Sequence, residues 1–345
     1  MNYWQNKKVL VTGGTGFIGS YLSELLVEAG AEVTIVDNLS RGSLDRIASV
    51  AREIKFLNLD LYEATHCLKA CEKQDIVMNL AAKVTGIEYN RSHMADMFES
   101  NMKLQMNVMQ ASWQAGVKRF LQVSTACICP HDAVVPTPES KGERGSPEPT
   151  NEGYGWAKRI GEQLAKYYTK EKGMEAVVAR PFNAYGPRDH FNEGTSHVIP
   201  ALIKRVLDGN DPVVIWGSGN QSRAFVHAKD IARGMMLLVE KAPAGQPVNI
   251  GHDRETTIKD LFYLICKVLG RYPKPYFDTS KPDGYSRRAA DVTLLRQLTG
   301  FTPSISLEDG IQEIVERASF SGDLAKAEKA CFSKRVIQTP SGMIS

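Results

Sequence analysis

Short apolar runs alternate with stretches of helical periodicity through the first half of the chain. The runs predict six buried strands, at 9–11, 33–36, 54–59, 76–80, 119–123 and 176–179. The periodic stretches between them predict helices, of which the longest cover 94–114 and 152–172. Apolar strands that alternate with helices are typical of a parallel sheet covered on both faces, so we expect an α/β fold with a doubly wound sheet.

The second half of the chain has a less regular pattern. It predicts a helix, a strand and a second helix, at 197–207, 213–216 and 228–240. Two short apolar runs, at 224–226 and 248–250, flank the second of these helices, and we expect both to rejoin the sheet. The earlier segment 130–149 is rich in Pro, Glu and Gly, which predicts an exposed loop.

A glycine-rich segment links the first predicted strand to the first predicted helix. It reads Thr-Gly-Gly-Thr-Gly-Phe-Ile-Gly over 12–19, between the apolar run 9–11 and the helical pattern at 21–27. Strand, glycine turn and helix in this order are the context that a dinucleotide-binding segment needs. The sheet is therefore predicted to be of the Rossmann type, with ligands at the carboxyl ends of its strands.

The individual residues of this segment have separate predicted tasks. Gly13 allows the tight turn, Gly16 lets the backbone approach a pyrophosphate, and Gly19 lets the helix pack close to the strand. The backbone N–H groups at the helix start, including those of Phe17 and Ile18, would then meet the phosphates at the positive end of the helix dipole.

Acidic and small residues follow the next strands. Asp37, at the end of the second strand, would accept hydrogen bonds from ribose hydroxyls and repel a 2′-phosphate, which favours NAD over NADP. Arg41 is close enough in sequence to weaken this preference, and a turn or helix cap is the alternative role of Asp37. Further cofactor candidates at strand ends are Asn38, Asp60, Leu61, Leu80, Ala81 and Ala82.

These patterns predict two domains and a tail. An NAD-binding domain of the Rossmann type would take residues 1–182 and about 224–252. A smaller mixed C-terminal domain, for the substrate, would take 183–223 and 253–320, and the polar residues 321–345 would form a tail.

Composition limits the class of protein more than its function. The chain has 345 residues, 43% of them hydrophobic, enough for a real core, and its net charge of +3 is too small to indicate nucleic acid or a membrane surface as a partner. No run of about 18 apolar residues predicts a membrane span, and the polar segment 1–8 predicts no signal peptide. The six cysteines lack the spacing of a disulfide scaffold, so we expect a cytoplasmic protein.

Tyr154 and Lys158 lie four residues apart on the predicted helix 152–172, so they share one face. A phenol has a pKa of about 10, and we expect the Lys158 ammonium and a positive nicotinamide ring to lower the pKa of Tyr154 towards neutrality. Tyr154 would exchange a proton with a sugar hydroxyl, Lys158 would hold the nicotinamide ribose, and Thr125 would bond the same sugar oxygen. A surface pair is the alternative, but the glycine segment and the strand-end hydroxyl favour catalysis.

Together, these motifs resemble those of one family. The resemblance to the extended short-chain dehydrogenase/reductases rests on Asp37 and on the segments 12–19, 79–82, 123–125 and 154–158. This family includes NAD-dependent sugar epimerases and dehydratases, and the resemblance spans about 7–320. It implies an NAD-dependent enzyme for a nucleotide-diphosphate sugar, and a homodimer with helices 94–114 and 152–172 as the candidate interface.

A second set of motifs is similar to those of the GDP-L-fucose synthases and, in part, the GDP-mannose 3,5-epimerases. The set covers 81–84, 127–130, 183–187, 196–202, 216–219, 223–227 and 281–284. In fucose synthases a cysteine and a histidine form the acid/base pair that inverts carbons 3 and 5 beside a 4-keto group, and by resemblance these roles fall on Cys127 and His197. The ketone acidifies both neighbouring carbons, so one residue can remove a proton that the other returns on the opposite face. Without the resemblance, the two would be a small buried residue and a surface residue.

The same resemblance assigns substrate contacts. Arg205 and Arg223 would meet the nucleotide diphosphate, which suits the paired donors of a guanidinium group. Asn183 and Trp216, together with His197, would line the pocket for the sugar and the nucleotide. No spacing of cysteines and histidines predicts a metal site.

Two departures from the fucose synthase pattern shape the prediction. Asp37 argues against NADPH, from which those enzymes take their final hydride, and Cys129 replaces their usual tyrosine. We therefore expect NAD-dependent oxidation of carbon 4 of a nucleotide sugar, with a GDP-sugar favoured, followed by epimerisation at carbon 3 or 5 or by release of the 4-keto product. Three alternatives stay open: an NADPH-dependent GDP-L-fucose synthase, a UDP-hexose 4-epimerase and a non-catalytic NAD-binding regulator.

Overall fold

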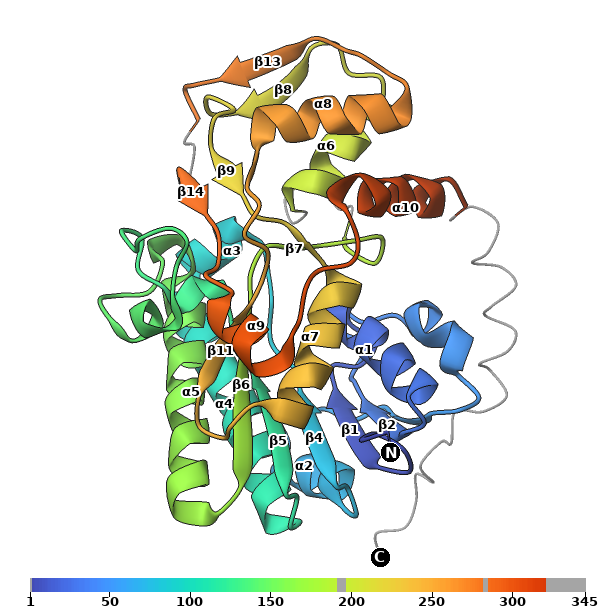
Figure 1. Cartoon of the computed structure of the whole chain (residues 1–345), viewed down its shortest axis with the longest axis vertical. Helices are drawn as coiled ribbons and strands as arrows, with labels where there is room; N and C mark the ends of the chain where they lie inside the picture. Colours follow the sequence, from blue (N-terminus) through green and yellow to red (C-terminus); the bar gives the residue numbers. More distant parts are fainter. Residues whose placement is uncertain (1, 191–196, 282–284, 321–345) are drawn as a thin grey trace, which may run out of the picture.

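The computed structural model describes residues 2–190, 197–281 and 285–320. Within these ranges a seven-stranded parallel sheet forms the base of the molecule, in the order β11-β6-β5-β4-β1-β2-β3 (Figure 1). The strands are β1 (Lys8–Thr12), β2 (Glu32–Val36), β3 (Lys55–Leu57), β4 (Ile76–Asn79), β5 (Arg119–Val123), β6 (Glu175–Pro181) and β11 (Pro247–Ile250). The expected Rossmann-type sheet is confirmed, and the predicted tail at 321–345 lies outside the described residues.

Helices cover both faces of this sheet. One face packs on α1 (Phe17–Glu28) and α7 (Ala228–Lys241), and the other on α2 (Ala64–Cys71), α4 (Met94–Gln114) and α5 (Glu152–Lys172) (Figure 1). Side chains alternate between the faces along each strand, as in β1, where Val9 and Val11 join the first core and Leu10 the second. All three are fully buried, which explains why the strands form continuous apolar runs.

A smaller group of elements sits at the carboxyl ends of these strands, at the top of Figure 1. Its core joins α6 (Val198–Leu207), α8 (Ile258–Leu269) and α10 (Leu307–Phe320) to β8 (Val213–Trp216), which pairs in parallel with β13 (Pro275–Asp278). Short strands connect it to the sheet layer: β7 (Ala184–Tyr185), β9 (Ser222–Arg223), β10 (Val226–His227), β12 (Thr256–Thr257) and β14 (Arg287–Arg288). Further helices are α3 (Ile87–Ser92), α9 (Thr293–Thr299) and the 3-10 helices η1 (Leu44–Val50), η2 (Ala126–Ile128), η3 (Glu139–Glu143) and η4 (Pro149–Asn151).

Some local predictions were wrong. The run 224–226 does not rejoin the main sheet, because β10 at its end pairs with β7 in a separate two-stranded sheet. The segment 130–149 is not a plain exposed loop: it contains η3, and Thr137 is buried and bonds the backbone of residues 289–291. The third strand is also shorter than predicted, ending at Leu57.

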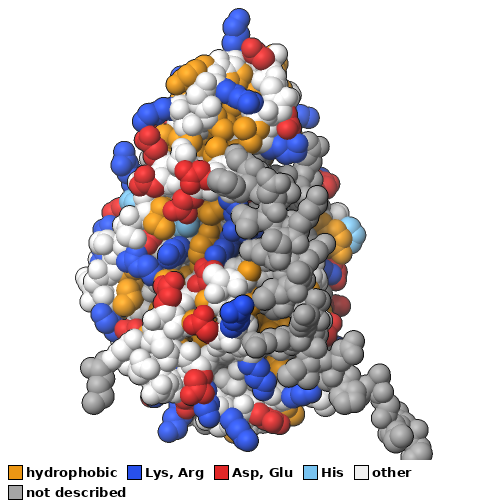
Figure 2. Space-filling view, turned by 90° about the vertical axis from the view of Figure 1, so that its right-hand side faces the viewer, with side chains coloured by type: hydrophobic (Ala, Val, Ile, Leu, Met, Phe, Trp, Pro, Cys, Tyr) orange, Lys and Arg blue, Asp and Glu red, His pale blue; other side chains and the backbone are white. Residues whose placement is uncertain are grey.

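The surface carries mixed charges. On the face shown in Figure 2, Lys and Arg side chains are interspersed with Asp and Glu side chains, in keeping with the small net charge of +3. Across the described residues, no helix has the length and apolar character needed to span a membrane. The same residues include no group of three or more His, Cys, Asp or Glu side chains arranged to hold a metal ion.

Candidate active site

The glycine segment makes a tight loop between β1 and α1. Gly13 has a φ of +67°, which favours glycine, and a β-carbon there would lie only 3.2 Å from Cα of Ala81 after β4. A β-carbon at Gly19 would overlap the carbonyl oxygen of Gly13. The loop is therefore bare of side chains at the point where α1 begins, as the sequence predicted.

The start of α1 fits a phosphate group. The helix begins at Phe17 with Gly16 as its cap residue, and no side chain caps it. Its first N–H groups, with that of Ile18 among them, belong to the set that a helix leaves unsatisfied at its N-terminus. The neighbouring Thr15 hydroxyl is buried and has no hydrogen-bond partner among the described residues. A bare glycine loop, an uncapped helix start and an orphaned hydroxyl together fit the diphosphate of a dinucleotide.

Asp37 directly follows β2 and faces this loop. Its Oδ1 accepts the backbone N–H of Leu39 at 2.9 Å, and its Oδ2 accepts that of Thr15 at 3.2 Å. Arg41 donates instead to the carbonyl oxygen of Val84. Asp37 thus has the turn-forming role considered above, and it also places an acidic group at the end of β2.

The other strand-end candidates have mainly structural contacts. Asn38 and Asp60 accept the backbone N–H groups of residues two positions later, Ser40 and Tyr62. The Leu61 side chain is buried in the core formed with α2 and α4, so its predicted cofactor contact finds no support in its orientation.

The residues after β4 are tied to β1. Ala81 donates its backbone N–H to the Thr12 hydroxyl at 3.0 Å, and Leu80 donates to the Thr12 carbonyl. Leu80, Ala81 and Ala82 are half-buried, and the backbone of Leu80 and Ala81 lies against Gly13 of the glycine loop. Their contact with a cofactor stays a prediction.

The carboxyl end of β5 leads into the turn that carries two of the predicted catalytic residues, Thr125 and Cys127. Thr125 caps η2, and its hydroxyl oxygen accepts the backbone N–H of Cys127 at 3.3 Å. The preceding Ser124 hydroxyl is buried without a hydrogen-bond partner among the described residues. The flanking residues Ala126 and Ile128 are buried, so η2 is anchored while the Cys127 side chain is half-buried.

Helix α5 packs directly on η2. A β-carbon at Gly155 would lie 2.8 Å from the carbonyl oxygen of Cys127, so only glycine allows this approach. The glycine lies next to Tyr154, and one turn later Lys158 donates from Nζ to the carbonyl oxygen of Val123 at 3.0 Å. The Lys158 Nζ lies 5.8 Å from the centroid of the Tyr154 ring. Tyr154 and Lys158 thus lie on the helix that packs against the carboxyl end of β5, which Thr125 follows, and their action as one catalytic set stays a prediction.

Burial dominates the protonation of this pair. It lowers the pKa of Lys158 to about 8, although the Glu162 carboxylate opposes this change. Burial raises the pKa of Tyr154, and the charge of Cys127 raises it further. In the chain by itself, burial therefore keeps the pKa of Tyr154 above its usual value. The predicted lowering, which includes the charge of the nicotinamide ring, stays a prediction for the complex with the cofactor.

His197 is held on a different element from Cys127. It caps α6, and its Nδ1 lies 2.8 Å from Oδ2 of Asp189. This hydrogen bond raises the pKa of His197 and engages the ring through Nδ1, so Nε2 is the nitrogen to which the predicted proton transfer falls. Within the described residues, no hydrogen bond or ion pair joins Cys127 to His197, so their pairing as acid and base stays a prediction.

A sequence comparison with known families agrees with this geometry. The model of the "NAD dependent epimerase/dehydratase family" matches residues 9–251. The chain belongs to this family. It is therefore an NAD(P)-dependent enzyme of the extended short-chain dehydrogenase/reductase type, with the glycine loop and the Tyr154/Lys158 pair in the matched part.

Individual members of the family are similar to this chain over most of its length. The chain is 34% identical to GDP-L-fucose synthase 1 of Arabidopsis thaliana, over 90% of this chain and 92% of that protein. It is 30% identical to GDP-mannose 3,5-epimerase 1 of Oryza sativa subsp. indica, over 90% and 82%. Its structure is similar to that of UDP-glucose 4-epimerase from Thermotoga maritima with UDP-glucose, with a TM-score of 0.82, 29% identity and coverage of 91% and 99%.

The predicted substrate residues of this family member lie on the smaller group of elements. Arg205, on α6, donates to the carbonyl oxygen of Val214 at 2.6 Å. Arg223, on β9, donates to the carbonyl oxygens of Ser222 and Tyr285, each at 2.7 Å. Both guanidinium groups thus have backbone partners that fix them in place, and their contact with a diphosphate stays a prediction.

The other two predicted substrate residues differ in exposure. The Trp216 side chain is 56% exposed at the end of β8, whereas its neighbour Ile215 points into the core. Asn183 is half-buried, and its amide donates to the carbonyl oxygens of Ala224 and Arg288 at 3.0 and 2.9 Å. Asn183 therefore serves as a cross-link between segments, and a pocket role for it stays a prediction.

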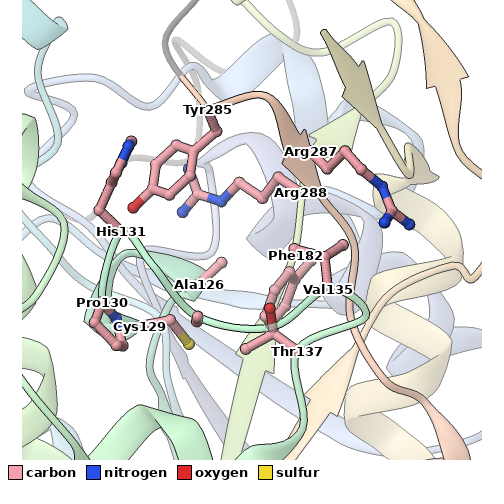
Figure 3. A pocket seen from close by; sticks show the side chains of 11 residues that line it. Ala126, Cys129, Pro130, His131, Val135, Thr137, Phe182, Tyr285, Arg287 and Arg288 are labelled. Atoms are coloured by element: carbon pink, nitrogen blue, oxygen red, sulfur yellow. The ribbon is translucent and has the colours of Figure 1, made fainter.

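Sequence reasoning missed several side chains at the site. Arg288 donates to the Cys127 sulfur at 3.3 Å, and the Tyr285 ring lies 5.0 Å from its guanidinium carbon (Figure 3). Tyr285 directly follows the 281–284 motif, and Arg288 comes three residues later, so that motif was the available signal in the sequence. Residues 282–284 themselves lie outside the described part of the chain. Asp189, the partner of His197, lies in no motif that the sequence analysis singled out.

Proposed function

We propose that this protein is an NAD-dependent epimerase of a GDP-linked sugar, which oxidises carbon 4 and then exchanges the proton on carbon 3 or 5. The observation that supports this proposal is the position of Cys127. Its backbone N–H bonds the Thr125 hydroxyl, and its carbonyl contacts α5 beside Tyr154. A thiol at this point is next to the groups that would handle the carbon 4 hydroxyl, where a ketone acidifies the neighbouring carbons.

The cofactor in this proposal is NAD. The glycine loop and the start of α1 would hold its diphosphate, and Asp37 would accept hydrogen bonds from its adenine ribose. The acidic group after β2 and the engagement of Arg41 with Val84 support NAD over NADP. When bound, oxidised NAD supplies a positively charged hydride acceptor and its reduced form a hydride donor.

The Thr125, Tyr154 and Lys158 side chains handle the oxygen on carbon 4. Tyr154 accepts the hydroxyl proton on oxidation and returns it on reduction, while the Thr125 hydroxyl donates a hydrogen bond to the same oxygen. Lys158 is anchored on the Val123 carbonyl, which leaves two of its donors for a ribose and for Tyr154. The same set stabilises the enolate oxygen during proton exchange.

Cys127 and His197 divide the proton exchange in this proposal. Cys127 as a thiolate takes the proton from the carbon beside the ketone, and the C–H electron pair moves into the enolate. His197, oriented through Nδ1 by Asp189, returns a proton from Nε2 to the opposite face. The raised pKa of His197 favours its protonated form for this task.

The substrate class follows from the relatives and from the basic residues. The Arabidopsis and rice relatives have names that contain GDP-L-fucose and GDP-mannose. Arg205 and Arg223 carry paired donors suited to a diphosphate, and the exposed Trp216 ring suits a base. The names of these relatives support a GDP-sugar over a UDP-sugar, whereas the arginine and tryptophan side chains suit either nucleoside diphosphate.

An NADPH-dependent GDP-L-fucose synthase is the second candidate. The 34% identity to the Arabidopsis protein over nine-tenths of this chain favours it. It differs in one checkable respect: net reduction of a 4-keto substrate consumes NADPH, whereas the proposed epimerase returns its hydride and keeps NAD.

A homodimer through α4 and α5 also stays a proposal. Large apolar side chains remain exposed on these helices, which supports an interface there: Met106, Trp113, Ile160 and Tyr167.

The proposed reaction can be tested on the purified full chain. The protein is denatured to identify any released dinucleotide by mass, and fresh protein is incubated with GDP-mannose in D₂O and followed by NMR. Tightly held NAD and deuterium at carbon 3 or 5 are expected. Deuterium at neither carbon would overturn the role of Cys127, and a dinucleotide-free protein that prefers NADPH would make fucose synthase the assignment.

A further inference from the structure

One arginine side chain joins the two loops that flank the glycine loop. Strand β1 lies between β2 and β4 in the sheet (Figure 1), so the β2 loop (residues 37–43) and the β4 loop (residues 80–86) stand on either side of its carboxyl end. Arg41 extends from the β2 loop and donates from Nη1 to the carbonyl oxygen of Val84 in the β4 loop. These two residues are 43 positions apart in the sequence, so the hydrogen bond connects separate parts of the chain.

We infer that Arg41 closes a bridge over a bound dinucleotide, so that NAD stays in place between successive turnovers. This inference rests on NAD as the cofactor of the proposed function, and it adds a residue that retains the cofactor. An enzyme that returns its hydride to the sugar ends each cycle with the same oxidised NAD, so it has no need to release it. A synthase that consumes NADPH must exchange its dinucleotide in every cycle, and a closed bridge would slow that exchange.

The bridge completes a closed ring of chain and hydrogen bonds. On one side, the backbone N–H of Thr15 donates to Oδ2 of Asp37 at 3.2 Å, and the chain after Asp37 leads to the bridge. On the other side, the chain leads back to Ala81, whose backbone N–H donates to the Thr12 hydroxyl at 3.0 Å. Thr12 and Thr15 lie on one short segment, so the ring returns to its start. A ligand inside such a ring leaves more easily once one of its bonds opens.

Both ends of the bridge are anchored on other elements. The Arg41 carbonyl oxygen accepts from the side chain of Arg46 in η1 at 3.3 Å, and the same side chain donates to the carbonyl oxygen of Thr15 at 3.4 Å. Lys83, one residue before the acceptor, is held on α4: its backbone N–H donates to Asn101 at 3.0 Å, and its carbonyl accepts the Asn101 amide at 3.1 Å. The donor and the acceptor are therefore positioned by separate parts of the fold.

The ring has room where a diphosphate would lie. Apart from its chain neighbours, a β-carbon at Gly16 would meet within 4 Å only the carbonyl oxygen of Gly13, among the residues that the structure describes. A β-carbon at Gly42 of the β2 loop would overlap the orphaned Thr15 hydroxyl, so only glycine lets this loop lie so close to the glycine loop. The β2 loop thus packs directly against the segment that would hold the phosphates.

A direct contact between Arg41 and a phosphate would also strengthen binding, so the test must separate it from the bridge. The hydrogen bond to Val84 uses one of the five N–H donors of the guanidinium group. The two roles differ in the chain without a ligand. There the bridge holds the β2 and β4 loops together, whereas a phosphate contact has no effect on either loop.

The first measurement is the release of NAD from the full chain. Dinucleotide-free protein is loaded with radiolabelled NAD and chased with excess unlabelled NAD, and the label that stays bound is counted after rapid desalting. R41M keeps the length of the side chain but removes its donors, and it should release the label at least about tenfold faster than the wild type. R52M is the control, because it removes the same charge from an exposed site outside both loops, and it should release the label at the wild-type rate.

The second measurement is amide hydrogen exchange in the dinucleotide-free chain. R41M should speed exchange in the peptides that cover the β2 and β4 loops, because the hydrogen bond that holds them together is lost. R52M should leave the exchange of these peptides unchanged. Unchanged exchange in R41M would overturn the bridge even if this variant releases NAD faster, since Arg41 would then act only on the ligand.

The outcomes also separate the inference from the proposed function. Equal release rates of the wild type and R41M overturn the inference, and so does a wild type that retains no label through desalting. Neither measurement needs a sugar. If R41M releases NAD and exchanges amides faster while deuterium enters neither carbon 3 nor carbon 5 of the sugar, the Arg41 bridge stands and the epimerase proposal falls.

Discussion

Gly155 and Cys127 lie in direct contact, since a β-carbon on Gly155 would be 2.8 Å from the carbonyl oxygen of Cys127 and 2.6 Å from Cβ of Pro147. Through this contact, helix α5 fixes the distance between Tyr154 and the cysteine-bearing turn. The proposed function needs both side chains at one substrate, so the packing of a single glycine controls the geometry of the reaction.

Gly155→Ala should therefore impair activity more than a normal helix substitution. The added methyl group must push α5 away from η2, which should destabilise the protein by about 1–3 kcal/mol and lower turnover further by misplacing Tyr154. Urea unfolding and initial rates measure the two effects. Gly234→Ala in α7 is the control, because the atoms nearest to its β-carbon belong to the Ile250 side chain, at 3.1 Å or more, and not to a backbone. Equal effects of the two variants would contradict the prediction.

Asp37→Asn should weaken the preference for NAD. The amide oxygen can still accept one of the two backbone N–H groups that Asp37 binds, those of Thr15 and Leu39, and the substitution removes the negative charge that repels a 2′-phosphate. We expect the ratio of NADP to NAD affinity to rise at least about tenfold, as measured by titration of both dinucleotides. Asp45→Asn, an exposed neighbour on η1, should leave the ratio unchanged.

The buried Lys158 makes a prediction about stability and pH. Its pKa is about 8 in the folded protein and about 10.4 in an unfolded chain, so between these values the folded state binds fewer protons. The stability of the wild type relative to Lys158→Met should therefore increase as pH rises from 8 to 10, by about 2 kcal/mol. Urea unfolding at several pH values gives the difference in the free energy of unfolding between the two proteins. A difference that stays constant with pH would show that the pKa of Lys158 is not lowered in the folded protein.

Substitutions in the buried Arg180–Glu162 ion pair should destabilise the protein far more than substitutions in surface ion pairs. Arg180 is fully buried and its carboxylate partner is 6% exposed, so Arg180→Met leaves an unpaired buried charge. We expect a loss of about 3–5 kcal/mol, partly recovered when Glu162→Gln is added. Arg91→Met, in the exposed pair with Glu88, should change stability by less than about 0.5 kcal/mol, as measured by the same unfolding experiment.

The sequence predicted the elements that have strong periodicity. Helices α4 and α5 and strand β5 have the predicted bounds, because their apolar positions repeat at the helix or strand period over their whole length. The two-residue strands β9 and β10 are too short to show a period, and their partners are chosen by tertiary packing. This is why 224–226 was assigned to the wrong sheet.

The candidate site was only partly predictable for a related reason. Tyr154 and Lys158 share a helix, so their spacing predicts that they lie on a common face. The extent to which they are buried depends on how η2 and β5 pack against that helix, which the spacing does not give. Arg288 lies 161 residues after Cys127, and no local pattern links them. Contacts of this kind depend on how β14 is placed, and only the folded structure contains that information.

The most direct test of the central claim is deuterium exchange in a cysteine variant. Wild type and Cys127→Ser are each incubated with GDP-mannose in D₂O, and the reduced dinucleotide is followed by absorbance while NMR locates the deuterium. The proposed function predicts that the variant still oxidises carbon 4, while deuterium entry at carbon 3 or 5 falls by about a hundredfold or more. Deuterium entry at the wild-type rate in Cys127→Ser would contradict the account.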